Sequence, residues 1–376
     1  MKNLKIQNIE QALTFDDILA VPAYSEVLPK DVCLKTKLTN KIKLNIPLMS
    51  SAMDTVTESA MSIQLALLGG VGVIHKNLSI AQQAQEVKTV KTFKVEKEQY
   101  PCANFDEQQQ LIVGAAISTS EDALMRLQAL IEVGLDFVVI DSAHGHSLAV
   151  INLVKKARSL YPDLQIIAGN IATYQAAKDL HEAGVDAVKV GIGPGSICTT
   201  RVVAGIGVPQ ITAVANVYAY CQAYDLPLIS DGGIKYSGDL IKALGVGADV
   251  VMLGSMFAGT KEAPGNVITI NDQHFKSYVG MGSMIAMERG SSDRYFQKDI
   301  KKLVPEGIES LVKYKGEVAN IIYQLVGGLR SGMGYTGCKT ISEIKDKVEF
   351  VRITYAGLSE SHPHGVEMVK EPPNYK

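Results

Sequence analysis

Eight short apolar runs recur along the chain, separated by stretches with apolar residues at helical spacing. The runs are continuously apolar rather than alternating, which is typical of strands buried on both faces of a parallel sheet. Intervening stretches such as 121–134 and 173–184 end in glycine, the residue expected just past a helix C-terminus. This alternation predicts an α/β fold, a (β/α)8 TIM barrel. The predicted strands span 46–53, 71–75, 112–117, 137–143, 165–170, 187–192, 226–232 and 250–255.

We expect residues 1–376 to form a single catalytic barrel domain, although three stretches do not fit the repeat. Residues 92–110 are polar and aperiodic, which predicts a short surface linker. Residues 257–325 are rich in glycine, methionine and charge, and they predict a long structureless excursion after the eighth strand, a mobile flap. The tail, 356–376, carries prolines and paired histidines that do not suggest a helix.

Each predicted strand ends in small or polar residues. The carboxyl ends of barrel strands form the active-site face, so the pattern predicts more than ordinary turns. The glycines after the seventh and eighth strands expose backbone N–H groups where barrels commonly hold phosphate, and we predict phosphate binding there. The strand-end residues are Ser51, His75, Ser118, Asp141, Ser142, Asn170, Gly193, Asp231, Gly232, Gly254 and Ser255.

Composition narrows the classes of function. A formal net charge of −2 argues against a dedicated nucleic-acid or membrane surface. The chain has neither an apolar leader nor an apolar run long enough to span a bilayer. The cysteines are scattered and include no CxxC pair, which disfavours disulfides or a zinc site and favours a cytoplasmic location. We expect Cys33, Cys102, Cys221 and Cys338 to be small buried hydrophobes.

The fifth cysteine lies in a loop of different composition, GIGPGSICTTR at 191–201, after the predicted sixth strand. Its glycines allow positive φ, and its polar neighbours leave Cys198 partly exposed, as a nucleophilic thiolate requires. Carbonyls of Gly193 and Gly195 that point away from any ladder need N–H donors or a cation such as K⁺. The hydroxyl groups of the loop belong to Ser196, Thr199 and Thr200. These residues alone leave hydrolase, transferase and oxidoreductase chemistry open.

The ordered motifs of the chain resemble those of the inosine 5′-monophosphate (IMP) dehydrogenase family along nearly its whole length. The matching blocks are LTFDDILAVP, SSAMDTVTE, GVIHKN, DSAHGHS, AGNIAT, GIGPGSICTTRVVAGIGVPQ, SDGGI, GMGSMIAM, RYFQ, VPEGIE, GGLRSGMGY and ESHPH. Most members carry a pair of regulatory CBS modules between the second helix and the third strand. Here only the linker at 92–110 occupies that place, so the chain resembles a short form, natural or engineered, without nucleotide control through those modules.

This resemblance implies oxidation of IMP to xanthosine 5′-monophosphate (XMP) with NAD⁺, the committed step of guanine nucleotide synthesis. Cys198 would add to carbon 2 of the purine, a hydride would pass to NAD⁺, and water would hydrolyse the resulting thioimidate. In the family a mobile flap brings the pair that matches Arg294 and Tyr295 into the site to activate water. Thr200 and Glu306 offer a second proton route.

The resemblance also implies the binding residues. The nucleotide would contact Ser51, Met53, Ser196, Asp231, Gly232, Gly233, Gly254, Ser255, Tyr278, Gly280, Met281, Gly282 and Glu306. NAD⁺ would contact Asp141, Ser142, Ala143, Asn170, Gly191, Gly193 and, from the neighbouring subunit, Tyr335. In a homotetramer, K⁺ would join Gly193, Gly195 and Cys198 of one subunit to Glu360, Ser361 and His362 of the next.

Two alternative functions belong to different classes. GMP reductase shares the barrel and the cysteine loop but deaminates GMP to IMP with NADPH, and its flap lacks the Arg-Tyr pair. A non-catalytic nucleotide-binding protein would need neither the thiol nor the flap pair. The histidine pairs at 144/146 and 362/364 argue only weakly for a transition metal, because no cysteine or carboxylate cluster completes a site.

Overall fold

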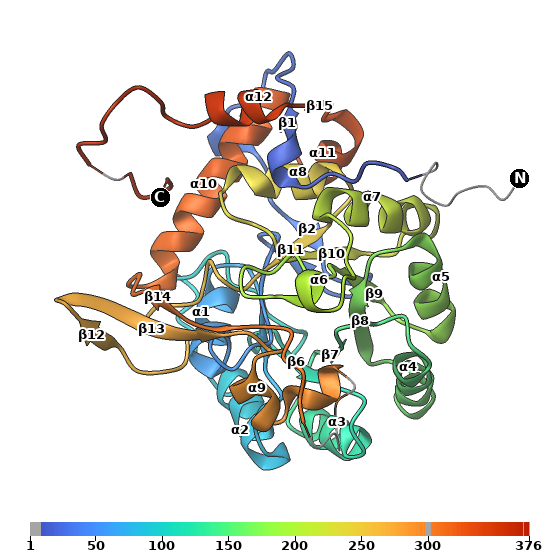
Figure 1. The fold of residues 1–376 in the computed structure, drawn as a ribbon. Coiled ribbons are helices and arrows are strands. Elements are labelled where there is room, and N and C mark those ends of the chain that lie inside the picture. The colour runs from blue at the N-terminus through green and yellow to red at the C-terminus, as the bar shows by residue number, and fades with distance from the viewer. Residues whose placement is uncertain (1–8, 296, 298–301, 371, 376) are drawn as a thin grey trace, which may run out of the picture.

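A computed structural model describes residues 9–295, 297, 302–370 and 372–375, and its centre is an eight-stranded parallel sheet (Figure 1). The sheet order is β4-β11-β10-β9-β8-β7-β6-β5. It closes because Met49 bridges Val71, with the Ser50 N–H donating to the Val71 carbonyl at 3.1 Å. The predicted (β/α)8 barrel is therefore confirmed. Its strands are β4 (Leu48–Ser50), β5 (Gly72–Ile74), β6 (Val113–Ile117), β7 (Phe137–Asp141), β8 (Gln165–Ile171), β9 (Ala187–Val190), β10 (Leu228–Asp231) and β11 (Val250–Leu253).

Helices surround the barrel and have clear local causes. In α5, the Thr173 hydroxyl accepts from the Ala176 N–H at the start, and Gly184 ends the helix with φ of 107°. The last barrel helix, α10, follows the excursion and packs against α8 and α1. The barrel helices are α1 (Ser59–Leu67), α2 (Ile80–Lys91), α3 (Ala123–Glu132), α4 (Leu148–Leu160), α5 (Tyr174–Ala183), α7 (Gln210–Cys221), α8 (Gly238–Gly245) and α10 (Val318–Thr336).

Two apolar clusters hold these layers together. One lies between the strands and the helices, and the other fills the barrel with side chains such as Met49, Phe137 and Met252. Phe137 occupies the space beside Gly114, where an added Cβ would lie 2.2 Å from its ring. The barrel is thus a packed core with no pore, and ligands must bind at its rim.

The excursion after β11 has more structure than the sequence predicts. It contains an antiparallel sheet of β12 (Ile268–Ile270), β13 (Gln273–Val279) and β14 (Glu309–Lys313), seen as an arm beside the barrel in Figure 1. The expectation of a structureless stretch was wrong, because β13 pairs in antiparallel register with β12 on one side and with β14 on the other. Its predicted end at residue 325 was also wrong, since α10 begins at Val318.

A short helix, α12 (Tyr355–Glu360), corrects the prediction for the first residues of the tail. The Thr354 hydroxyl accepts from the Gly357 N–H and starts this helix, and the prolines that disfavour helix come only afterwards. The remaining elements are η2 (Phe15–Asp17), β1 (Ile18–Ala20), η3 (Pro29–Asp31), β2 (Thr36–Lys37), β3 (Lys43–Leu44), α6 (Thr200–Val203), η4 (Gln222–Tyr224), α9 (Met284–Glu288), η5 (Ser291–Tyr295), α11 (Ile341–Lys347) and β15 (Phe350–Arg352).

The other cysteines only partly match the expectation of burial. Cys221 and Cys338 are buried, and burial raises the pKa of the Cys221 thiol to about 12. Cys33 and Cys102 are exposed, so their prediction was wrong: both lie in irregular segments outside the barrel. Across the described residues, no helix combines the length and the apolar character needed to cross a bilayer.

Candidate active site

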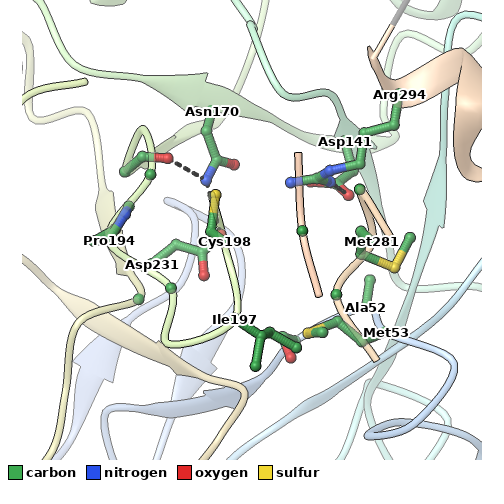
Figure 2. A pocket seen from close by; sticks show the side chains of 18 of the residues that line it. Ala52, Met53, Asp141, Asn170, Pro194, Ile197, Cys198, Asp231, Met281 and Arg294 are labelled. Atoms are coloured by element: carbon green, nitrogen blue, oxygen red, sulfur yellow. Dashed lines mark hydrogen bonds and ion pairs between the residues drawn. The ribbon is translucent and has the colours of Figure 1, made fainter. Parts of the chain in front are cut away.

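A cavity opens at the carboxyl ends of the barrel strands, and Figure 2 shows Cys198 facing it. Most of the residues predicted for the site line it: Ser51, Met53, Asp141, Asn170, Gly191, Gly193, Gly195, Cys198, Asp231, Gly232, Tyr278, Gly280, Met281, Gly282, Arg294, Tyr295 and Glu306. A second hollow shares Ser51, Met53 and Asp231 with it and adds Ser196, Gly233, Gly254 and Ser255. The fold therefore brings together residues that are more than 250 positions apart in the sequence, such as Ser51 and Glu306.

The loop that carries Cys198 is fixed by backbone contacts. Cys198 donates its N–H to the Gly195 carbonyl at 3.1 Å, and its thiol donates to the Thr200 hydroxyl at 3.2 Å. The Thr199 N–H donates to the Glu306 carbonyl at 2.9 Å, so the loop also pairs with the segment before β14. Cys198 is partly exposed, as a reacting thiol must be.

The Arg201 side chain anchors this loop through hydrogen bonds to backbone carbonyls. Its guanidinium donates to the carbonyl of Ile192 at 3.2 Å and to that of Val208 at 2.7 Å. Gly193 has φ of 78°, and a Cβ there would lie 2.7 Å from the Arg201 side chain. Glycine is required at this position by both its conformation and the lack of space.

A buried lysine that the sequence analysis did not single out links two of the acidic residues that line the cavity. Lys189 of β9 is 2% exposed, and its ammonium group donates to Asp231 at 2.6 Å and to Asp141 at 3.0 Å. It also donates to the Asn170 amide oxygen, while the Asn170 NH₂ donates to the Gly191 carbonyl at 2.8 Å. The sequence did contain a signal, a charge inside the apolar run 187–192, because such a charge is buried only when it is paired.

Small and hydroxyl-bearing residues form the other end of the cavity. The buried Tyr278 hydroxyl is hydrogen-bonded to Ser196, and burial raises the pKa of Tyr278 to about 12, so the phenol stays protonated. The Ser51 hydroxyl is buried and has no hydrogen-bond partner among the described residues. A Cβ at Gly254 would lie 3.0 Å from the Tyr278 oxygen and 3.1 Å from that of Ser51. This end offers an unsatisfied hydroxyl, that of Ser51, to an oxygen-rich ligand.

The short helix η5, which follows α9, contributes Arg294 and Tyr295 to the wall of the cavity. The Arg294 guanidinium forms an ion pair with Asp141 of β7, which Figure 2 shows side by side, and the Ala143 N–H donates to the Arg294 carbonyl at 3.0 Å. The Arg294 Nε is buried without a partner in the part of the chain that the structure describes. Tyr295 lies next to it, and burial is the main cause that raises the pKa of its phenol.

Several predicted residues lie outside the main cavity. Ala143 and Thr200 line an adjoining hollow that also includes Tyr295 and Glu306. The Ser142 hydroxyl accepts from the His144 N–H at 3.2 Å. These positions flank the site without lining its centre.

Four predicted residues are not brought to the cavity within one chain. Tyr335 is 69% exposed on α10. Glu360, Ser361 and His362 lie at the end of α12, and His362 is hydrogen-bonded to the Tyr375 hydroxyl at 2.8 Å. Their predicted roles need a neighbouring subunit. Among the described residues there is no cluster of three or more histidine, cysteine or carboxylate side chains that would suit a transition metal.

These features define a class: a (β/α)8-barrel enzyme with a cysteine presented between acidic and glycine-rich strand ends. The model of the "IMP dehydrogenase / GMP reductase domain" matches residues 12–364, and the chain belongs to this family. It is 51% identical to the inosine-5′-monophosphate dehydrogenase of Borreliella burgdorferi, covering 95% of this chain and 98% of that protein. It is 50% identical to the enzyme of that name from Cryptosporidium parvum, covering 98% and 99%.

The Bacillus subtilis inosine-5′-monophosphate dehydrogenase is 43% identical, with 97% of this chain and 98% of that protein covered. That alignment extends over 478 residues, although this chain has 376, so the longer relative carries residues without a counterpart here. The Borreliella and Cryptosporidium alignments extend over only 394 and 398 residues. This chain is thus a short form like theirs.

Proposed function

We propose that the protein oxidises IMP to XMP with NAD⁺ and water, the committed step of guanine nucleotide synthesis. One observation carries the proposal: the Cys198 thiol faces a cavity with hydroxyl-bearing and glycine residues at one end and buried carboxylates at the other. The curated relatives, named inosine-5′-monophosphate dehydrogenase, supply the reaction.

The nucleotide would lie across the cavity with its phosphate at the Tyr278 end. Backbone N–H groups of Gly233 and Gly254 and the unpartnered Ser51 hydroxyl suit phosphate oxygens. Asp231 would accept from the ribose hydroxyls, because a carboxylate has lone pairs left after binding Lys189. The purine would then lie against Met53 and Met281, close to the thiol.

In the first step, the Cys198 thiol loses its proton and its sulfur forms a bond to carbon 2 of the purine. Carbon 2 becomes tetrahedral, and the electron pair of its double bond to N3 takes up a proton at N3. The C2–H bond then breaks, its electron pair leaves with the hydrogen as hydride, and a carbon–sulfur thioimidate remains on the protein. The loop contributes position: the backbone contacts of Cys198 hold its sulfur at one place on the cavity wall.

NAD⁺ bound in the acidic half would supply the hydride acceptor. The residues present fit a ribose and an amide, because Asp141 and Asn170 line the cavity with oxygen and nitrogen atoms. Asp141 is already paired with Arg294 in this structure, where Arg294 of the flap segment, residues 284–295, lines the cavity. Because Arg294 takes up space in this part of the cavity, we expect it to move away before NAD⁺ binds there.

In the second step, water attacks carbon 2, the sulfur leaves, and XMP is released with a proton. Arg294, which lines the cavity, returns to Asp141, and its guanidinium can donate a hydrogen bond to the attacking water. Arginine stays protonated in proteins, so it serves best as donor and electrostatic support. The route through Thr200 and Glu306 would take the proton.

The chain also fits part of a K⁺ site. Carbonyl oxygens of a tight loop are the ligands that such a cation accepts, and Gly193 has the left-handed φ that turns the chain there. The ion would hold that turn, with Glu360, Ser361 and His362 coming from the next subunit of a homotetramer. A cytoplasmic location suits a protein that needs its thiol reduced.

The test is direct. Purified protein mixed with IMP, NAD⁺ and KCl should produce NADH absorbance, and NaCl in place of KCl should lower the rate sharply. Mass spectrometry of protein quenched during turnover should find the nucleotide attached to the peptide that contains Cys198. NADPH-dependent conversion of GMP to IMP without IMP oxidation would instead assign GMP reductase activity. Active protein without the adduct would refute the covalent route, and equal rates in Na⁺ would refute the cation site.

A further inference from the structure

The flap segment, defined here as residues 284–295, crosses the ends of four neighbouring barrel strands. It makes a polar contact beyond each of them. Arg289 lies 3.7 Å from Asp54 beyond β4, and Arg294 pairs with Asp141 at the end of β7. Between these two outer contacts, Asp293 meets Lys76 beyond β5 and Ser118 beyond β6.

The contacts in the middle are the most enclosed. The side chains of Lys76 and Asp293 are each only 10% exposed. The Lys76 ammonium donates to both carboxylate oxygens of Asp293 and, at 2.8 Å, to the Gly290 carbonyl. The Ser118 hydroxyl donates to the same carboxylate. Side chains beyond β5 and β6 thus bind Asp293, the residue directly before Arg294.

Lys76, Ser118 and Asp293 are not among the residues that line the cavity. We infer that Lys76, Ser118 and Asp293 form a latch that sets how often the flap segment is closed, and so positions Arg294 for the hydrolysis step. They are positioning residues, because they act on the reaction only through Arg294. The inference rests on the proposed function, since it assumes a step that needs Arg294 and a step that needs it absent.

The energetics of the latch suit a contact that must open in every turnover. Closing it removes both charges from water, and that desolvation offsets much of the attraction, so the net free energy of closure stays small. Closure also competes with NAD⁺, because Arg294 occupies Asp141 only in the closed state. The latch therefore biases a two-state equilibrium whose open state binds NAD⁺ and whose closed state hydrolyses the adduct.

The variant Asp293→Asn separates these effects. It removes the charge that Lys76 and Ser118 hold while keeping the size of the side chain. We expect hydrolysis to slow about tenfold or more, from the coupling typical of a buried contact network. The NADH burst of the first turnover should keep its rate, and inhibition by excess NAD⁺ should set in at lower concentration because the open state is favoured.

A double-mutant cycle and matched controls make the test specific. Lys76→Met alone leaves a buried carboxylate unpaired, so Lys76→Met with Asp293→Asn should be less harmful than the product of the single effects. Glu288→Gln removes a charge from an exposed side chain of the same segment and should change neither step. The melting temperature of each variant reports whether the barrel itself is intact.

The outcomes distinguish the two proposals. If the unmodified protein produces no NADH from IMP, the proposed function fails. If it turns over with a burst but Asp293→Asn hydrolyses the adduct at the normal rate, only the latch is overturned. Equal losses in burst and hydrolysis, or additive effects in the cycle, would also overturn the latch, because both indicate general structural damage.

Discussion

The cysteine loop and the flap segment both border the cavity, but they are held in place by different kinds of contact. The loop is fixed by backbone hydrogen bonds and by Arg201, whose donors go to two backbone carbonyls. The flap segment is held mainly by ion pairs between side chains: Arg289–Asp54, Asp293–Lys76 and Arg294–Asp141. This difference fits the proposed roles. The thiol proposed to bond one carbon atom is fixed through the main chain, and the arginine proposed to enter and leave the site is attached by ion pairs that water can replace.

The largest expected effect concerns the loop. Cys198→Ala removes the nucleophile, so NADH formation from IMP should fall by about 10⁴-fold or more, as when other covalent nucleophiles are removed. IMP binding, measured by calorimetry, should persist, because the proposed phosphate and ribose contacts do not involve the thiol. Steady NADH production by this variant would show that the loop has no covalent role.

The next effect concerns the flap segment. Arg294→Ala leaves the thiol in place and should slow hydrolysis by about 10²- to 10³-fold, the cost of removing one preorganised donor. Rapid mixing should show a burst of NADH followed by a slow steady rate. If the burst and the steady rate fall together, Arg294 has no specific role in hydrolysis.

A smaller effect should come from loosening the loop without touching the thiol. Arg201→Met removes the donors to Ile192 and Val208. Both steps should slow together by about tenfold, because misplacing the sulfur affects bond formation as well as bond cleavage. The same rapid-mixing experiment checks it, and a loss confined to hydrolysis would contradict the assignment of Arg201 to the loop.

The barrel could be predicted from the sequence because each buried strand has its own apolar run, which needs no partner to be recognised. The excursion could not be predicted so well. Strand β13 is half exposed, and its pairing with β14 depends on residues 30 or more positions away. Its alternation is weak beside the surrounding glycines and charges. The start of α10 at Val318 was missed for a related reason. The polar residues before it, 313–317, do not mark a clear boundary between the excursion and the helix.

In the site, residues at strand ends were predictable because the barrel assigns them to one face. Lys189 was missed because it lies within a strand, where position along the chain says nothing about a partner. The latch was missed because Lys76 and Asp293 are 217 positions apart and meet only in the folded chain. A charge inside an apolar run, such as Lys189, indicates that a partner exists, but the sequence does not show which residue that partner is.

Lys189 has one more consequence. Its single ammonium group is shared between the carboxylate expected to face the nucleotide and the one expected to face the dinucleotide. A ligand that draws on Asp231 shifts that positive charge away from Asp141, and the reverse also holds. Lys189 therefore couples the two halves of the pocket electrostatically. An inhibitor that binds one half should have an affinity that depends on the ligand in the other half.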